Sequence, residues 1–268
     1  MSEIAEIAPI TIVDGDGLRR ITLVDAKRRN ALSMRMMTAL TEAIAAAGAD
    51  PAVRVVIVAA EGPAFSAGHD LKELTAARAD ADRGRGFFTT TMRTCANLML
   101  SIVRCPKPVI AEVAGVATAA GCQLVASCDL AVAAEGASFA TPGVHIGLFC
   151  STPMVALSRN LSRKHAMEML LTGAPVSAAE AARLGLVNRV VAREALTAET
   201  ETLARAIASK SPLTLKIGKE AFYAQAEMGL ADAYELTARV MVENMLIRDA
   251  EEGISAFVEK RTPVWEGR

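Results

Sequence analysis

The sequence predicts an α/β fold built around a parallel sheet. Short, continuous apolar runs recur along the chain at 53–59, 109–113, 130–134 and 186–191. Each run is too short for most helices and too uniformly apolar for a half-exposed strand, which is typical of strands buried on both faces. Segments with helical periodicity separate the runs, and strands joined through helices pair in parallel.

A hairpin and a helix are expected before the first of these runs. Residues 10–24 alternate well enough for two strands, and the DGDG sequence at 14–17 has the composition of a tight turn. Ser33 can cap a following helix, in which apolar side chains recur at helical spacing as far as Gly48.

The charged segment at 72–86 interrupts this periodicity. Arginine and aspartate alternate there with alanine and glycine, and apolar spacing resumes at Phe87. The composition fits two structures, a mobile flap over a site or a solvated helix end.

The segment 107–147 has the composition of a pocket-building unit. It comprises an apolar strand, small residues at 114–121, a helix starting near Ala120, a strand led by Asp129, and a loop at 139–147. Small residues let a backbone approach a ligand, and the first N–H groups of a helix lack acceptors, which suits partial negative charge. Small residues also serve tight helix packing on a sheet, so residue types alone leave both interpretations open.

From Leu196 the pattern is helical almost to the end. Ser211-Pro212 and Gly229 interrupt it. Apolar side chains are available for burial there at Leu230, Tyr234, Val240 and Met241. We therefore expect a core at 1–195 and a helical extension at 196–268 that carries subunit contacts.

Composition limits the functional classes. A chain of 268 residues and 28.2 kDa can bury a large core, and 52% hydrophobic residues exclude general disorder. A net charge of −1 gives no reason to expect nucleic acid or a membrane surface as a partner. The three histidines lack paired metal-ligand spacing, and no dinucleotide or P-loop fingerprint occurs, so neither a metal nor a nucleotide cofactor is expected.

Cysteine usage and the N-terminus predict a cytoplasmic protein. The five cysteines form no Cys-x-x-Cys pair, and an odd count does not suit a complete disulfide framework. Glu3 and Glu6 stand where a signal sequence would be basic and apolar, and no apolar run approaches the roughly 18 residues that span a bilayer.

Five fragments in a fixed order cover nearly the whole chain. They are FSAGHDLK at 65–72, KPVIA at 107–111, GCQL at 121–124, CDL at 128–130 and FVEKR at 257–261. Together they resemble the crotonase family, that is, the enoyl-CoA hydratases and isomerases. Residues 139–143 and 147–153 look closest to the subgroup of enoyl-CoA hydratase domain-containing protein 3. The resemblance implies a ClpP/crotonase-like spiral of ββα units with a C-terminal helical region for trimerisation.

The same resemblance implies an acyl-CoA thioester as ligand, with coenzyme A as part of the substrate and no separate cofactor. By position, the backbone N–H groups of His69 and Ala120 form an oxyanion hole for the thioester carbonyl. Further residues are implied to contact coenzyme A: Ala67 and Lys72 along its length, and Phe257 and Lys260 toward its nucleotide end, on the same or a neighbouring subunit. The implied assembly is a homotrimer or a homohexamer. Without the resemblance, both lysines would be interpreted as solvent-exposed charges.

Two positions depart from the family pattern. Hydratases of the family carry glutamates where this chain has Gln123 and Gly143. Neither residue exchanges a proton, although the Gln123 amide can bond a ligand or an ordered water. A positioned acid or base contributes about 10²- to 10⁴-fold in rate, so the loss of both predicts very slow hydration.

Replacement acids are conceivable at three positions. His145 suits proton transfer near neutral pH but is commonly a structural side chain. Cys150 fits a small buried side chain, and Asp70 fits a cap on the helix that follows it. Asp129 is expected to order the entry of its strand rather than to react.

Three functional hypotheses follow. The leading one is an acyl-CoA-binding protein, nominally an enoyl-CoA hydratase or isomerase, that stabilises a thioester enolate. The alternative is a non-catalytic acyl-CoA binder or regulator. A serine peptidase is disfavoured, because Ser66 lacks the Gly-x-Ser-x-Gly pattern and His145 has no evident partner.

Overall fold

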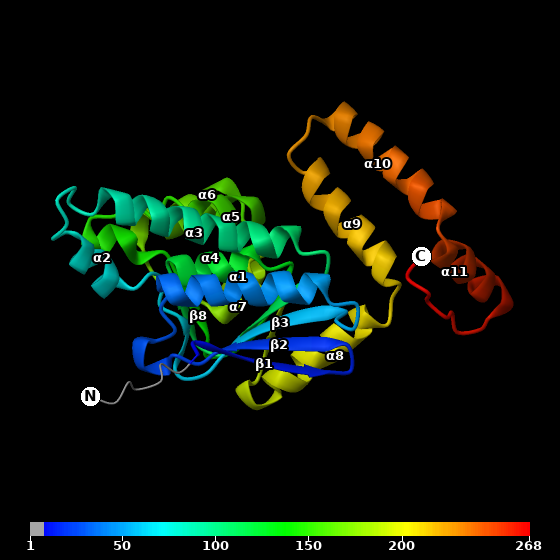
Figure 1. Ribbon diagram of the computed structural model, residues 1–268, viewed down its shortest axis with the longest axis horizontal. Coiled ribbons are helices and arrows are strands. Elements are labelled where there is room, and N and C mark those ends of the chain that lie inside the picture. Colours follow the sequence, from blue (N-terminus) through cyan, green and yellow to red (C-terminus); the bar gives the residue numbers. More distant parts are fainter. Residues whose placement is uncertain (1–7) are drawn as a thin grey trace.

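The computed structural model describes residues 8–268 and confirms the α/β class (Figure 1). Glu3 and Glu6, on which the location argument partly rests, lie outside the described residues. A six-stranded sheet has the order β1-β2-β3-β5-β7-β10, in which only β1 and β2 pair antiparallel. Its strands are β1 (Ile10–Gly15), β2 (Leu18–Leu23), β3 (Val55–Ala60), β5 (Val109–Val113), β7 (Leu130–Ala134) and β10 (Arg189–Val191).

The N-terminal hairpin is confirmed, and its turn has the chirality that a twisted hairpin requires. Asp16 and Gly17 join β1 to β2, and both have positive φ, at 53° and 76°. Two such residues form a turn whose twist matches that of the flanking strands. Ile10 therefore pairs with Leu23 and Gly15 with Leu18.

Both faces of the sheet are buried, which explains the unbroken apolar strands. Val56 and Val58 of β3 face one hydrophobic cluster, whereas Val55 and Ile57 face the other. The predicted helix α1 (Met34–Ala49) covers the first face, and the Ser33 side chain accepts a hydrogen bond from its Met36 N–H. Helix α8 (Leu196–Ala208) covers the second face (Figure 1).

A second, smaller sheet was missed by sequence analysis. It has the order β4-β6-β8-β9. Its strands are β4 (Ala64–Ser66), β6 (Val116–Thr118), β8 (Ser138–Ala140) and β9 (Val176–Ser177). Strands of two or three residues carry no periodic signal, so the sequence predicts only a turn at the position of β6 and a loop at the position of β8. The 3-10 helix η2 (Pro142–Ile146) follows β8.

The alternation of long strand, short strand and helix produces the expected spiral of ββα units. Strands β3 and β4 lead to α2 (Leu71–Ala77), and β5 and β6 lead to α4 (Ala120–Ser127). Strands β7 and β8 lead through η2 to α5 (Pro153–Asn160). The remaining elements of the core are η1 (Ala26–Arg28), α3 (Arg85–Arg104), α6 (Arg163–Thr172), α7 (Ala178–Leu184) and η3 (Arg193–Ala195).

Two sequence interpretations are resolved or corrected by local geometry. The segment 72–86 is a solvated helix end: it contains most of α2, an exposed turn, and the start of α3. The strand predicted at 186–191 begins only at Arg189, because Leu186 donates its N–H to the Ala181 carbonyl at 2.9 Å and closes the end of α7.

The last three helices project away from the core (Figure 1). They are α9 (Pro212–Gln225), α10 (Leu230–Leu246) and α11 (Arg248–Glu259). Leu230, Tyr234 and Met241 are 77%, 70% and 59% exposed in this single chain. The division of the chain at 195/196 stays a prediction. In the part of the chain from residue 8 onward, no helix is long and apolar enough to cross a membrane.

A buried ionic cluster holds α9 against the sheet. Lys219 donates to an Asp129 carboxylate oxygen at 2.6 Å and to the carbonyls of Ile102 and Lys107, both at 3.0 Å. The hydroxyl of Tyr223 donates to the other Asp129 oxygen at 2.8 Å. Asp129 also accepts the Val109 N–H at 2.7 Å, which confirms the expected role of this carboxylate at the strand entry.

Candidate functional site

The start of α4 carries a strained residue that leaves helix amides without partners. Ala119 has φ 50° and ψ −120°, a conformation that residues other than glycine rarely adopt. Its N–H donates to the Ala140 carbonyl at 2.9 Å, and its carbonyl accepts the Gln123 N–H at 3.0 Å. The N–H of Ala120, the first helical residue, donates to no acceptor found among residues 8–268. Such a donor is suited to an oxyanion.

The loop after β4 lies directly against this helix start. Gly68 has φ +87°, and a Cβ added to it would lie 2.9 Å from the Cβ of Ala119 and 3.2 Å from the Ala120 nitrogen. A Cβ at Gly121 would collide with the Ser66 carbonyl. Glycine is required at both positions, because the two backbones approach more closely than a side chain allows.

His69 follows Gly68 and enters the same region. The Gly68 carbonyl accepts the Leu32 N–H at 2.7 Å, and Leu32 forms an isolated parallel bridge with His69. The N–H of His69, like that of Ala120, donates to no acceptor within the described chain. Two predicted oxyanion residues are therefore brought close together by Gly68.

The His69 side chain is largely buried. Its Nδ1 lies 3.3 Å from the Leu32 carbonyl, and its Nε2 is buried with no partner among the described residues. Burial lowers the pKa of His69, whereas the bond to Leu32 opposes that shift. A neutral ring that donates from Nδ1 to the carbonyl leaves the Nε2 lone pair as an acceptor.

Gln123, at the first glutamate position, points toward helix α3. The side chain is buried, and its Oε1 lies 3.7 Å from the Cys95 sulfur, which donates to it. Burial raises the pKa of Cys95 to about 11, so the thiol keeps its proton near neutral pH. The contact with Cys95 could not be predicted, because the two residues are 28 positions apart.

Gly143, at the second glutamate position, has no room for a side chain. A Cβ there would lie 2.7 Å from the Leu148 carbonyl oxygen and 2.9 Å from the Cys150 sulfur. The Leu148 N–H also donates to the Gly143 carbonyl at 2.9 Å. Cys150 is buried, as expected, and burial raises the pKa of its thiol.

The other conceivable acids have different surroundings. Asp70 caps α2, because its Oδ1 accepts the N–H of Lys72 at 2.8 Å and of Glu73 at 3.4 Å. His145 is exposed, and its Nε2 lies 2.9 Å from where a Cβ on Gly173 would stand. Its part in proton transfer stays a prediction.

The predicted coenzyme A residues lie in two separate places. Ala67 and Lys72 are exposed beside the His69 loop. Phe257 and Lys260 are exposed at the end of α11, which lies at the opposite end of the molecule from α2 (Figure 1). One chain therefore does not bring the two pairs together.

Comparison with known proteins gives a consistent result. A sequence profile of the family described as enoyl-CoA hydratase/isomerase matches residues 14–268. The rat enoyl-CoA hydratase domain-containing protein 3, mitochondrial, is 50% identical over 93% of this chain and 82% of its own length.

Solved structures agree with this match. The crystal structure of the human enoyl coenzyme A hydratase domain-containing protein 3 is 49% identical, with a TM-score of 0.91 over 96% of this chain and 100% of that one. An enoyl-CoA hydratase from Mycobacterium smegmatis is 48% identical, also with a TM-score of 0.91, over 96% of this chain and 98% of that one.

The expected cytoplasmic location is wrong by this comparison. The rat relative and its four other vertebrate counterparts are named mitochondrial, which contradicts that expectation. The inference failed because unpaired cysteines indicate only a reducing compartment and do not say which one.

Proposed function

The chain belongs to the enoyl-CoA hydratase/isomerase, or crotonase, family, in the subgroup of enoyl-CoA hydratase domain-containing protein 3, and from this we propose that it binds acyl-CoA thioesters. The thioester carbonyl is held by the N–H groups of His69 and Ala120. The observation that carries the proposal is the contact of Gly68, whose missing side chain lets the His69 loop meet the start of α4. Both amides are without acceptors among the described residues.

These donors favour a reaction that passes through an enolate. Negative charge grows on the carbonyl oxygen when a proton leaves the α-carbon, and a positioned donor there is worth about 3 to 4 kcal/mol. The buried start of α4 strengthens this effect, because little water competes for the oxygen. Stabilising the enolate does not by itself move the proton.

Ordinary hydration also needs one group to take a proton from water and another to supply one to carbon. Gln123 and Gly143 stand in the two positions where hydratases of the family carry glutamates. Neither residue can take up or supply a proton. The proposed protein therefore binds and polarises an acyl-CoA while hydrating an enoyl-CoA very slowly.

Coenzyme A is expected to run from the acyl group past Ala67 and Lys72. Phe257 and Lys260 reach the nucleotide end from a neighbouring subunit of a homotrimer or homohexamer. The separation of α11 from α2 in one chain supports this arrangement, because Phe257 is then free to serve a different site (Figure 1).

Loss of the conjugated thioester absorbance of 2-enoyl-CoA tests the proposal directly. Saturable binding with turnover far below that of a two-glutamate hydratase is expected for short and medium chains. Turnover near the two-glutamate rate, abolished by Gln123→Ala, would refute the assignment of Gln123 as a non-basic residue.

A second candidate is a non-catalytic acyl-CoA binder or regulator. The loop at 148–150 that fills the space beside Gly143, and the contact of Gln123 with Cys95, both favour it. Saturable binding of many acyl-CoAs without conversion would support this function. Turnover of a β-ketoacyl, malonyl-type or chlorinated acyl-CoA would exclude it.

A further inference from the structure

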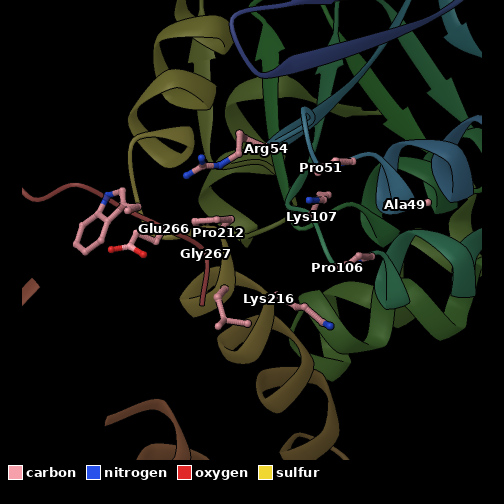
Figure 2. Close-up of a pocket in the computed structure, with 12 residues that line it drawn as sticks. Ala49, Pro51, Arg54, Pro106, Lys107, Pro212, Lys216, Glu266 and Gly267 are labelled. Atoms are coloured by element: carbon pink, nitrogen blue, oxygen red, sulfur yellow. The ribbon is translucent and has the colours of Figure 1, made fainter. Parts of the chain in front are cut away.

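A cavity of about 520 Å³ lies where the core meets the C-terminal helices (Figure 2). Four segments line it: the end of α1 with the turn into β3, the turn into β5, the start of α9, and the chain end at 265–267. The two turns lie before the first residues of β3 and β5. Gly68 lies after β3 and β4, and Ala120 lies after β5 and β6, at the carboxyl ends of these strands. The cavity therefore lies at the amino edge of the parallel strands, opposite the proposed thioester site.

Three cationic residues from three of these segments line the cavity. They are Arg54, Lys107 and Lys216. Burial is the main cause that lowers the pKa of Lys107, and the positive charges of Arg54 and Lys216 lower it further, whereas Cys105 and Asp50 oppose the shift. Lys107 is therefore close enough to both other cations to be repelled by them, and a bound anion would relieve that repulsion.

Arg54 has unused hydrogen-bonding capacity. Its Nη2 donates to the Lys210 carbonyl at 2.5 Å, which fixes the guanidinium across the junction between core and extension. Its Nε is buried and has no acceptor within residues 8–268. A buried guanidinium N–H without an acceptor is costly, and a bound oxygen atom would satisfy it.

The carboxylates near the cavity are engaged elsewhere. Glu266 lines the cavity but is 2.6 Å from Arg268 and 3.7 Å from Arg248. Asp50, which acts on Lys107, is paired with Arg19 at 3.0 Å and accepts the Ala52 N–H at 2.9 Å. Both carboxylates are thus shared with other cations, and Asp50 offsets only part of the positive charge around Lys107.

The N-terminus of α9 adds to the positive electrostatic potential of the cavity. Pro212 and Leu213 line the cavity in the first turn of this 14-residue helix. Ser211 accepts the N–H groups of Thr214 and Leu215, whereas the N–H of Leu213 donates to no acceptor in the described part of the chain. A helix N-terminus carries partial positive charge and favours an anion.

We propose that this cavity is a second ligand site, which binds a small phosphate-bearing anion between the core and the C-terminal helices. Lys107 belongs to the core, Lys216 to α9, and Arg54 spans the two through its bond to Lys210. The volume suits a ligand between pyrophosphate and a mononucleotide. Because both parts supply cations, the bound anion holds the extension against the sheet and raises the stability of the whole chain.

Thermal unfolding and calorimetric titration of the full chain, without acyl-CoA and at low ionic strength, test the site. Pyrophosphate, AMP and adenosine 3′,5′-bisphosphate are the probes, with NaCl at matched ionic strength as a control for screening. Saturable binding is expected, and Lys107→Gln or Lys216→Gln should weaken it about tenfold, which is typical of a lost charge-assisted bond. The probe that binds tightest shows whether the natural source is a free phosphate or a nucleotide.

Lys164→Gln is the matched control, because Lys164 is an exposed lysine outside the cavity. Its affinity for the probes should equal that of the unaltered protein. The proposal is overturned if the Lys107→Gln/Lys216→Gln double variant binds the probes as tightly as the unaltered protein. It is also overturned if no probe binds saturably. Acyl-CoA binding by the same double variant is measured separately, so the second site and the proposed thioester site succeed or fail independently.

Discussion

Cys150 occupies the space beside Gly143, with its sulfur 2.9 Å from where a Cβ at position 143 would stand. The Leu148 carbonyl closes the same space at 2.7 Å. The second glutamate of the family is thus not merely absent from this chain. The loop that follows occupies the volume into which a side chain at position 143 would extend.

A glutamate placed at position 143 should not restore hydration activity. Gly143→Glu forces the loop at 148–150 to shift, and overpacking of this kind costs about 1 to 3 kcal/mol of folding free energy. Urea unfolding measures the loss, and 2-enoyl-CoA hydration should stay slow. Gly136→Glu is the control, because a Cβ at Gly136 meets nothing within 4 Å. A stable Gly143→Glu protein with fast hydration would contradict the packing argument.

Gly68→Ala should separate the two proposed oxyanion donors. The added methyl group would meet Ala119 at 2.9 Å, so the His69 loop must move away from Ala120, and acyl-CoA affinity should fall at least about tenfold. Gly147→Ala is a matched control: Gly147 also has positive φ, at +75°, but its Cβ would meet nothing within 4 Å. Both variants carry the same kind of backbone strain, and only the first should lose binding in calorimetric titration. Equal losses in the two would remove the support that Gly68 gives to the site.

Asp129→Asn should destabilise the chain strongly. It leaves the buried Lys219 ammonium without its carboxylate, and breaking a buried pair in this way costs about 3 to 5 kcal/mol. Because the pair joins α9 to the sheet, limited proteolysis should also release the C-terminal helices earlier. Glu227→Gln breaks the exposed pair with Arg159 and should cost at most about 1 kcal/mol. Similar losses for the two variants would show that Asp129 does not hold α9.

Acid should destabilise the protein through His69. Burial lowers the pKa of this histidine in the folded chain below its ordinary value of 6.5, so the unfolded chain binds a proton first as the pH falls. The stability that His69 contributes is complete above pH 6.5 and is lost as the pH falls through the lower folded pKa. Denaturant unfolding between pH 8 and pH 5 measures this loss, and His69→Gln should flatten it. His145→Gln, at an exposed position, is the control. An NMR titration that gives His69 a pKa above 6.5 would show that the direction of the shift, and with it the expected loss of stability in acid, is wrong.

Local sequence was sufficient where the chain interacts with itself over short distances. Ser33 and Asp70 cap their helices through amides two or three residues away, and the DGDG turn sets the register of β1 and β2. Continuous apolar runs identified β3, β5 and β7, because a strand covered on both faces needs no polar alternation. The short strands of the second sheet escaped detection, since two or three residues hold no period.

The family, the main strands and the residue types at the candidate site, including the missing carboxylates at Gln123 and Gly143, can be predicted from the amino-acid order alone. The contacts of these positions are visible only in the folded chain: Gln123 contacts Cys95, Gly143 lies against Cys150 and Leu148, and Gly68 lies against Ala119. The fold also places Arg54, Lys107 and Lys216 around one cavity. This difference arises because close packing depends on groups far apart in the chain, whereas caps, turns and apolar runs depend on residues that are neighbours in sequence.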